Sequence, residues 1–111
     1  MPMDKWIIAV NHRPRMNDGV ELLKEKGHFS IYRYIDDWDE EGDTIYSVEE
    51  YLNGIPEQEF KAATGVASDR ALRQWITAHL IKERSNSLDA IVVFLDAHDI
   101  SYSNKYNGLT I

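Results

Sequence analysis

The sequence predicts one small domain of the α/β or α+β class, spanning residues 1–111, with a mixed sheet of about four strands. Two observations lead to this prediction. Short runs of β-branched and aromatic residues alternate along the chain with segments that carry helix signals. The length is that of one ordinary domain, and 43% of the residues are hydrophobic, which is enough for a core. One long amphipathic helix and two or three short helices are expected to accompany the sheet.

The first third of the chain is expected to hold a strand, a short helix and a second strand. Residues 5–11 form a run of β-branched and aromatic side chains. Asn17 or Asp18 can cap a following helix, which Gly27 would end. Residues 28–35 are again typical of a strand. This order favours a βαβ crossover, and an antiparallel pairing of the two strands stays open as the alternative.

The middle of the chain is expected to be a loop followed by a short strand and two short helices. Residues 36–43 include six acidic residues and a glycine, which predicts a solvent-exposed hairpin tip before a strand at residues 44–46. Residues 47–53 begin with the S-x-x-E pattern of a helix capping box. Pro56 suits the first turn of another helix, ending near Gly65.

The longest helix is expected to begin at Ser68 or Asp69. Apolar side chains then recur at helical spacing and would face the core. The residues of this stripe are Leu72, Trp75, Ile76, His79 and Leu80. Because His79 belongs to the stripe, we interpret it as a histidine at the core boundary rather than as a ligand.

Residues 91–95 are expected to be the central strand of the sheet. Five consecutive large apolar residues, Ile-Val-Val-Phe-Leu, avoid water on both faces of an extended segment. The polar residues that follow mark where this strand would emerge. A tail from Ile100 would then contain a tight turn at Asn107-Gly108.

Composition excludes several classes of site. The chain has no cysteine, so disulfides, thiolate metal sites and a cysteine nucleophile are excluded. No apolar run approaches the ~20 residues that a membrane helix needs, and no signal peptide is evident. We therefore expect a soluble cytoplasmic protein without a membrane partner. No glycine-rich phosphate loop or other cofactor motif is present, and no cofactor is expected.

The net charge of −7 is concentrated in one interval. Between Tyr34 and Phe60 the sequence has ten acidic residues and no Lys or Arg, whereas the rest of the chain has nine acidic and twelve basic residues. A field of that sign repels phosphate, so direct binding of nucleic acid is not expected. It attracts basic surfaces, and the aromatic side chains within the interval could anchor an interface.

The first candidate site is therefore a protein-binding surface. Its predicted residues are Asp36, Asp37, Trp38, Asp39, Glu40, Glu41, Asp43, Glu49 and Glu50. The alternative is a solvated loop whose charges only keep the protein soluble.

The second candidate site would lie where two strands end. His12 follows the first strand, and Asp96, His98 and Asp99 follow the expected central strand. If the two strands were parallel, these side chains would meet at one edge of the sheet. Asp96 and His98 could then hold a divalent metal, and the four residues could catalyse hydrolysis of a phosphate ester. The alternative is that they solvate and cap a strand end.

A non-enzymatic acidic binding domain is the function that the sequence favours. Its expected partner is a protein with a basic surface, and the example we consider is a nucleic-acid-handling enzyme whose site the carboxylates would occupy in place of phosphates. The protein would then act as an inhibitor that mimics nucleic acid. The alternative function is a small metal-assisted phosphoesterase-like enzyme that uses the second candidate site. The oligomeric state is left open.

Overall fold

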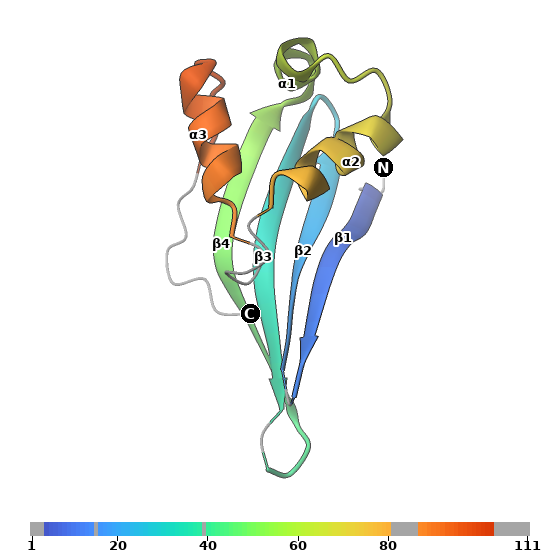
Figure 1. Ribbon diagram of the computed structural model, residues 1–111, viewed down its shortest axis with the longest axis vertical. Helices are drawn as coiled ribbons and strands as arrows, with labels where there is room; N and C mark the ends of the chain where they lie inside the picture. The colour runs from blue at the N-terminus through green and yellow to red at the C-terminus, as the bar shows by residue number, and fades with distance from the viewer. Residues whose placement is uncertain (1–3, 15, 39, 81–86, 104–111) are drawn as a thin grey trace.

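A four-stranded antiparallel sheet is the main element of the structure, a computed structural model that describes residues 4–14, 16–38, 40–80 and 87–103. The strands follow one another in the order of the chain, and three helices come after them (Figure 1). The domain is therefore α+β. The predicted mixed sheet is wrong, because all three strand pairs are antiparallel, and the strands do not form a βαβ crossover. The strands are β1 (Asp4–Arg13), β2 (Met16–Glu25), β3 (His28–Trp38) and β4 (Thr44–Pro56).

The first and third strands confirm the expected strands near residues 5–11 and 28–35. The helix expected after Asn17 is wrong, because that segment is strand β2, which pairs with β1 on one side and β3 on the other. Val20 and Leu22 alternate along β2 and are fully buried, a spacing of two that suits a strand. Gly27, with φ of 79°, forms the turn into β3 instead of ending a helix.

Strand β4 also replaces a predicted helix. Residues 47–53 lie within this strand, which pairs with β3. The hydroxyl of Ser47 donates a hydrogen bond to the Glu49 carboxylate (2.9 Å) and caps no helix. The expected hairpin tip is confirmed, although it is shorter than predicted because β3 continues to Trp38. Pairing with β3 thus outweighs the local capping signal.

Helices α1 (Glu57–Thr64) and α2 (Asp69–Ala78) confirm the predicted starts of both helices and the predicted end of α1. Gly65 ends α1 in the left-handed conformation, with φ of 79°. The hydroxyl of Ser68 accepts a hydrogen bond from the amide of Ala71 (3.1 Å) and so caps α2. At ten residues, however, α2 is not the long helix that the sequence predicted.

Helix α3 (Asp89–Ala97) occupies the segment expected to be the central strand. That prediction is wrong, and the burial pattern gives the reason. Ile91 and Leu95 lie one helical turn apart and are fully buried, whereas Val93 between them is 66% exposed. Only one face of the segment therefore avoids water. The expected turn at residues 107–108 lies outside the described residues.

The three helices pack against one face of the sheet at its broad end (Figure 1). Side chains from β2, β3, β4 and all three helices form one buried cluster between these layers. Its members are Val20, Leu22, Phe29, Ile31, Leu52, Ile55, Phe60, Leu72, Ile76, Leu80, Leu88, Ile91, Leu95 and Ile100. The other half of the sheet tapers to a narrow end, where the β3–β4 hairpin extends past the turn between β1 and β2.

Tyrosines line the opposite face of the sheet. Tyr32 and Tyr34 are buried there with Val48, and their rings contact Tyr51 and Tyr46 respectively. Burial raises the pKa of Tyr34 to about 12. This second cluster stabilises the sheet on the face that the helices do not cover.

No helix in the described part of the chain is long and apolar enough to cross a membrane.

Candidate partner-binding surface

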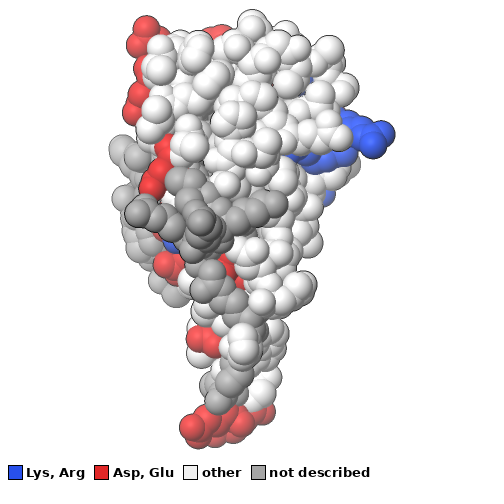
Figure 2. Space-filling model, in the orientation of Figure 1, with Lys and Arg blue, Asp and Glu red and all other residues white. Residues whose placement is uncertain are grey.

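The β3–β4 hairpin ends in a group of carboxylates at the narrow end of the molecule. We call its described residues the acidic tip: Asp36, Asp37, Glu40, Glu41 and Asp43. All but Asp36 are exposed to solvent, and Figure 2 shows acidic side chains at the extreme end of the molecule. Asp39, predicted to belong to the same surface, lies outside the described residues.

Two residues of the acidic tip, Asp36 and Asp37, belong to the sheet, and neutral residues lie opposite both. Asp36 pairs with Asn17 on β2 and Tyr46 on β4. Asp37 pairs with Met16 and Ile45. Carboxylates directly opposite one another would repel, and this register avoids that arrangement while keeping the charges at one end.

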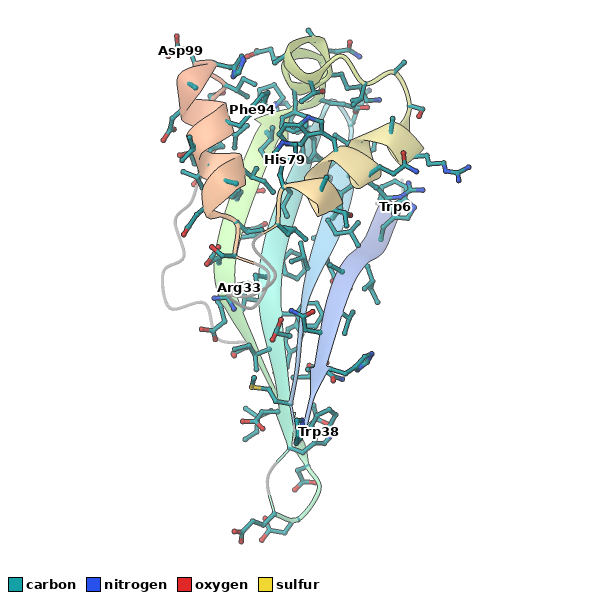
Figure 3. All side chains as sticks on the ribbon, in the orientation of Figure 1. Trp6, Arg33, Trp38, His79, Phe94 and Asp99 are labelled. Atoms are coloured by element: carbon teal, nitrogen blue, oxygen red, sulfur yellow. The ribbon has the colours of Figure 1, made fainter. Side chains whose placement is uncertain are left out.

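Apolar side chains accompany the carboxylates. Trp38 is half-buried at the base of the loop, where Figure 3 places it at the convergence of the strands. Its amide donates a hydrogen bond to the Asp37 carboxylate (2.8 Å). Ile45 follows on β4 and is 55% exposed. An exposed isoleucine and a half-buried tryptophan give the charged end two apolar contacts that a partner could bury.

Glu50 belongs to a different environment, although the sequence placed it in the same predicted surface. One oxygen of its carboxylate lies 3.4 Å from Nε of Arg33, and the other accepts a hydrogen bond from the amide of Leu88 (2.9 Å). Leu88 immediately precedes α3. Glu50 therefore anchors the start of that helix to the sheet. Glu49 is exposed and bonds to Ser47.

Glu57, another acid of the same interval, is the centre of a four-residue ionic cluster. Its carboxylate lies 3.0 Å from Lys24 and 2.7 Å from Lys61, and both ammonium groups also contact Asp69. Burial opposes ionisation of Glu57, but the hydrogen bonds from the two lysines outweigh it and lower the pKa of its carboxyl. The hydrogen bond from Lys24 likewise lowers the pKa of Asp69.

The acidic interval is thus divided between two environments. Glu50, midway along β4, and Glu57, at the broad end, lie against named bases and tie helices to strands. At the narrow end, Asp36 and Asp37 of the acidic tip have neutral cross-strand neighbours. The sequence located the acidic interval but gave no sign of this division, because Arg33, Lys24 and Lys61 all lie outside it.

The second candidate site depended on two parallel strands that the structure does not contain. His12 lies near the end of β1, towards the narrow end, whereas α3 ends at the opposite end of the molecule, where Figure 3 places Asp99. His12 bonds instead to the Asn17 side chain (2.9 Å), and Nδ1 of His98 to the carbonyl of Phe94 (3.0 Å). The structure therefore does not bring this predicted cluster together.

The residues at the end of α3 have local structural contacts. Asp96 accepts a hydrogen bond from the hydroxyl of Tyr102 (2.8 Å). Asp99 has a positive φ of 53°, and the next amide, of Ile100, bonds back to the carbonyl of Leu95 (3.0 Å). This geometry closes the helix. Among the described residues, no group of three or more His, Asp or Glu side chains could hold a metal ion.

One buried acid on the tyrosine face was not singled out from the sequence. Glu21 is 7% exposed, accepts a hydrogen bond from the hydroxyl of Tyr32 and lies 3.2 Å from Nζ of Lys5. Had the segment been recognised as a strand, the alternation of side chains would have placed Glu21 on the other face of the sheet from Val20 and Leu22. Its contacts indicate a structural role on the second face of the sheet.

Comparisons with protein-family models, with curated proteins and with solved structures found no match.

Proposed function

We propose that this protein is a non-enzymatic binding domain whose acidic tip engages a basic surface on another protein. The observation that carries the proposal is the position of the acidic tip. Its carboxylates come from the end of β3, the connecting loop and the approach to β4, so they gather at one end of the molecule. Charges gathered in this way steer a basic partner to that end before contact.

The shape of the narrow end supports insertion into a groove rather than contact across a flat surface. The molecule measures 47 × 30 × 24 Å along its principal axes, and the hairpin extends along the longest of them (Figure 1). The broad end, with the helices and the core, acts as the base. A two-stranded projection presents its carboxylates on several sides.

The chemistry of the acidic tip suggests the class of partner. A groove that binds a nucleic-acid backbone is lined with Lys and Arg that contact phosphates. Carboxylates on a narrow projection can occupy such a groove and form charge-assisted hydrogen bonds with the same bases. The protein would then inhibit a nucleic-acid-handling protein by excluding its substrate.

Trp38 and Ile45 supply apolar contacts that would lengthen the lifetime of the complex, which charge alone does not. Charged contacts at an exposed surface increase the association rate but add little to the lifetime of a complex. Apolar side chains that become buried slow dissociation. Trp38 is half-buried and Ile45 mostly exposed before binding, so a partner would remove further apolar area from water.

Affinity capture from a lysate of the organism that encodes the chain tests the proposal. The immobilised protein is compared at low and high salt with a variant whose tip is neutralised. The substitutions are Asp36→Asn, Asp37→Asn, Glu40→Gln and Glu41→Gln. We expect the parent to retain a basic protein at low salt and the variant to lose it. The captured protein is then identified, and its nucleic-acid binding is measured with and without the chain.

A matched control removes the same number of charges from exposed acids outside the acidic tip. Its substitutions are Glu25→Gln, Glu59→Gln, Asp89→Asn and Asp99→Asn. The control should capture the basic protein as the parent does. If both variants lose it equally, net charge alone drives retention and the tip is not a specific surface. If the captured protein binds nucleic acid equally well in the presence of the chain, the inhibitory role is wrong.

A further inference from the structure

A groove runs between strand β1 and helix α2, on the side of the sheet away from β4. Its volume is about 480 Å³. Its lining combines apolar and cationic side chains from the two elements. The lining residues that matter for the argument are Ile7, Ile8, Arg70, Arg73, Gln74 and Thr77. Figure 2 shows basic side chains projecting on this side of the molecule.

One wall of the groove is the edge of the sheet. β1 is the first strand in the sheet order, and among the described residues no strand pairs with its outer side. An edge strand presents backbone N–H and C=O groups that can pair with another extended segment. The other edge differs, because Asn53 of β4 exchanges two backbone hydrogen bonds with Ser103 (2.7 and 2.8 Å).

The other wall carries two arginines on successive turns of α2. Arg70 is exposed, whereas Arg73 is partly buried, with its guanidinium 4.6 Å from the centre of the Trp6 ring on β1. The hydroxyl of Thr77 donates a hydrogen bond to the carbonyl of Arg73 within α2 (2.8 Å) and lies 3.4 Å from the carbonyl of Ile8 on the strand. The cationic wall is thus fixed beside the strand edge before any ligand binds.

The two faces of an added strand would meet different surroundings. Side chains on the α2 face would approach Arg70 and Gln74, where carboxylates are favoured. Side chains on the opposite face would lie beside Ile7 and Val10, which are 63% and 37% exposed. Cross-strand apolar pairs on that face would be favourable. A segment in which acidic and apolar residues alternate matches both faces at once.

We propose that the β1 edge binds an extended segment of a partner protein as a fifth strand, and that this segment alternates acidic with apolar residues. Main-chain pairing with β1 supplies the part of the affinity that does not depend on the side chains of the segment. Arg70 and Arg73 select the acidic residues. The acidic tip lies at the narrow end of the molecule, whose longest axis measures 47 Å, and exposed charges separated by more than the Debye length of about 8 Å are largely screened at physiological salt. Its field therefore does not cancel the local attraction. This site is separate from the proposed function of the tip.

The test uses a fluorescein-labelled peptide of eight residues in which valine and glutamate alternate. Fluorescence anisotropy should show saturable binding to the full chain. Arg70→Glu should weaken it about tenfold or more, equivalent to about 1.4 kcal/mol. The matched charge reversal Lys26→Glu, at the exposed turn between β2 and β3, should leave it unchanged. Circular dichroism confirms that both variants are folded.

Two further peptides separate strand pairing from simple charge attraction. A valine–lysine peptide of equal length should not bind. A valine–glutamate peptide in which every amide is N-methylated should not bind, because it has no N–H group to donate to the ladder. Hydrogen exchange should show new protection of the β1 amides and none in β4 when the unmodified peptide is bound.

Several results would overturn the proposal. These are the absence of valine–glutamate binding, equal binding of the lysine or fully N-methylated peptide, and an unchanged affinity in Arg70→Glu. Sedimentation of the chain alone provides the last check, with a monomer expected. If the chain instead self-associates and Arg70→Glu abolishes this association, the occupant of the groove is a second copy and the proposed partner is wrong.

Discussion

Two parts of the chain around the β3–β4 hairpin use acidic residues in different ways. Glu50, midway along β4, and Glu57, at the start of α1, lie against Arg33, Lys24 and Lys61, and their carboxylates hold helices to the sheet. At the narrow end, Glu40 and Glu41 are exposed beyond the last pairs of the sheet. The comparison shows that a run of acids in sequence is not one functional surface. The elements packed around each carboxylate decide whether it stabilises the fold or faces a partner.

The largest expected effect on stability tests whether residues 91–95 form a helix or a strand. Ile91→Asp should unfold the protein, because an unpaired carboxylate in the core costs several kcal/mol out of a total stability of about 5–15 kcal/mol. Val93→Asp should leave it folded, because Val93 is 66% exposed on α3. Denaturant unfolding measures both. Unfolding by both substitutions would mean that the segment is a strand buried on both faces.

A second substitution tests how tightly the narrower half of the sheet is packed. A Cβ at Gly19 would lie 2.6 Å from the hydroxyl of Tyr34 and 2.9 Å from the carbonyl of Ala9. Gly19→Ala should therefore cost about 1–3 kcal/mol, the range for overpacking. Tyr34→Phe in the same background removes the hydroxyl and should restore part of the loss. A Gly19→Ala protein as stable as the parent would show that Tyr34 is not held over this strand.

The ionic cluster at the broad end should give a smaller effect with a defined pH dependence. Glu57→Gln should destabilise the protein by about 1–2 kcal/mol at neutral pH, less than for a fully buried pair because the partners are partly exposed.

The pKa values of Glu57 and Asp69 are lowered from ordinary values of 4.5 and 3.8. Their stabilising contribution is therefore complete above those values and disappears as the pH falls through the lower pKa values of the folded state. Unfolding free energies measured at acidic pH should fall more steeply in the parent than in a Glu57→Gln/Asp69→Asn variant. Parallel curves would mean that this cluster does not couple protonation to folding.

Neutralising the acidic tip is expected to have the smallest effect on stability. The same change is expected to have the largest effect on binding of the partner. Neutralising Asp36, Asp37, Glu40 and Glu41 should change the unfolding free energy by only a few tenths of a kcal/mol. The same variant should associate more slowly with the basic partner and show a flatter salt dependence. Trp38→Ala should instead increase the dissociation rate. Unaltered association kinetics in the neutralised variant would place the binding surface elsewhere.

Local signals in the sequence located two helices and two strands correctly, and the strand expected at residues 44–46 is the start of β4. The hydroxyl of Ser68 and the left-handed position at Gly65 act within a few residues of their own elements, so their effect does not depend on distant partners. The runs at residues 5–11 and 28–35 are rich in side chains that favour strands. The hairpin tip was also predictable, since six acids and a glycine between residues 36 and 43 cannot pack into a core.

Two predicted helices became strands because long-range pairing outweighed local signals. A capping pattern at residues 47–50 satisfies two amides, whereas pairing with β3 satisfies the backbone along the length of β4. The segment after Asn17 has strands on both sides, which no local signal reports.

By itself, the sequence determined the presence of both strands and helices, the caps of α1 and α2 and the exposure of the acidic loop, because each depends on neighbouring residues. Only the tertiary structure decided that residues 91–95 form a helix, since an apolar run suits either conformation until one face is packed and the other left in water. It also decided which carboxylates of the acidic interval meet Lys24, Lys61 and Arg33. Those bases are distant in sequence, and only the folded sheet brings them beside Glu57 and Glu50 while leaving the acidic tip at the opposite end.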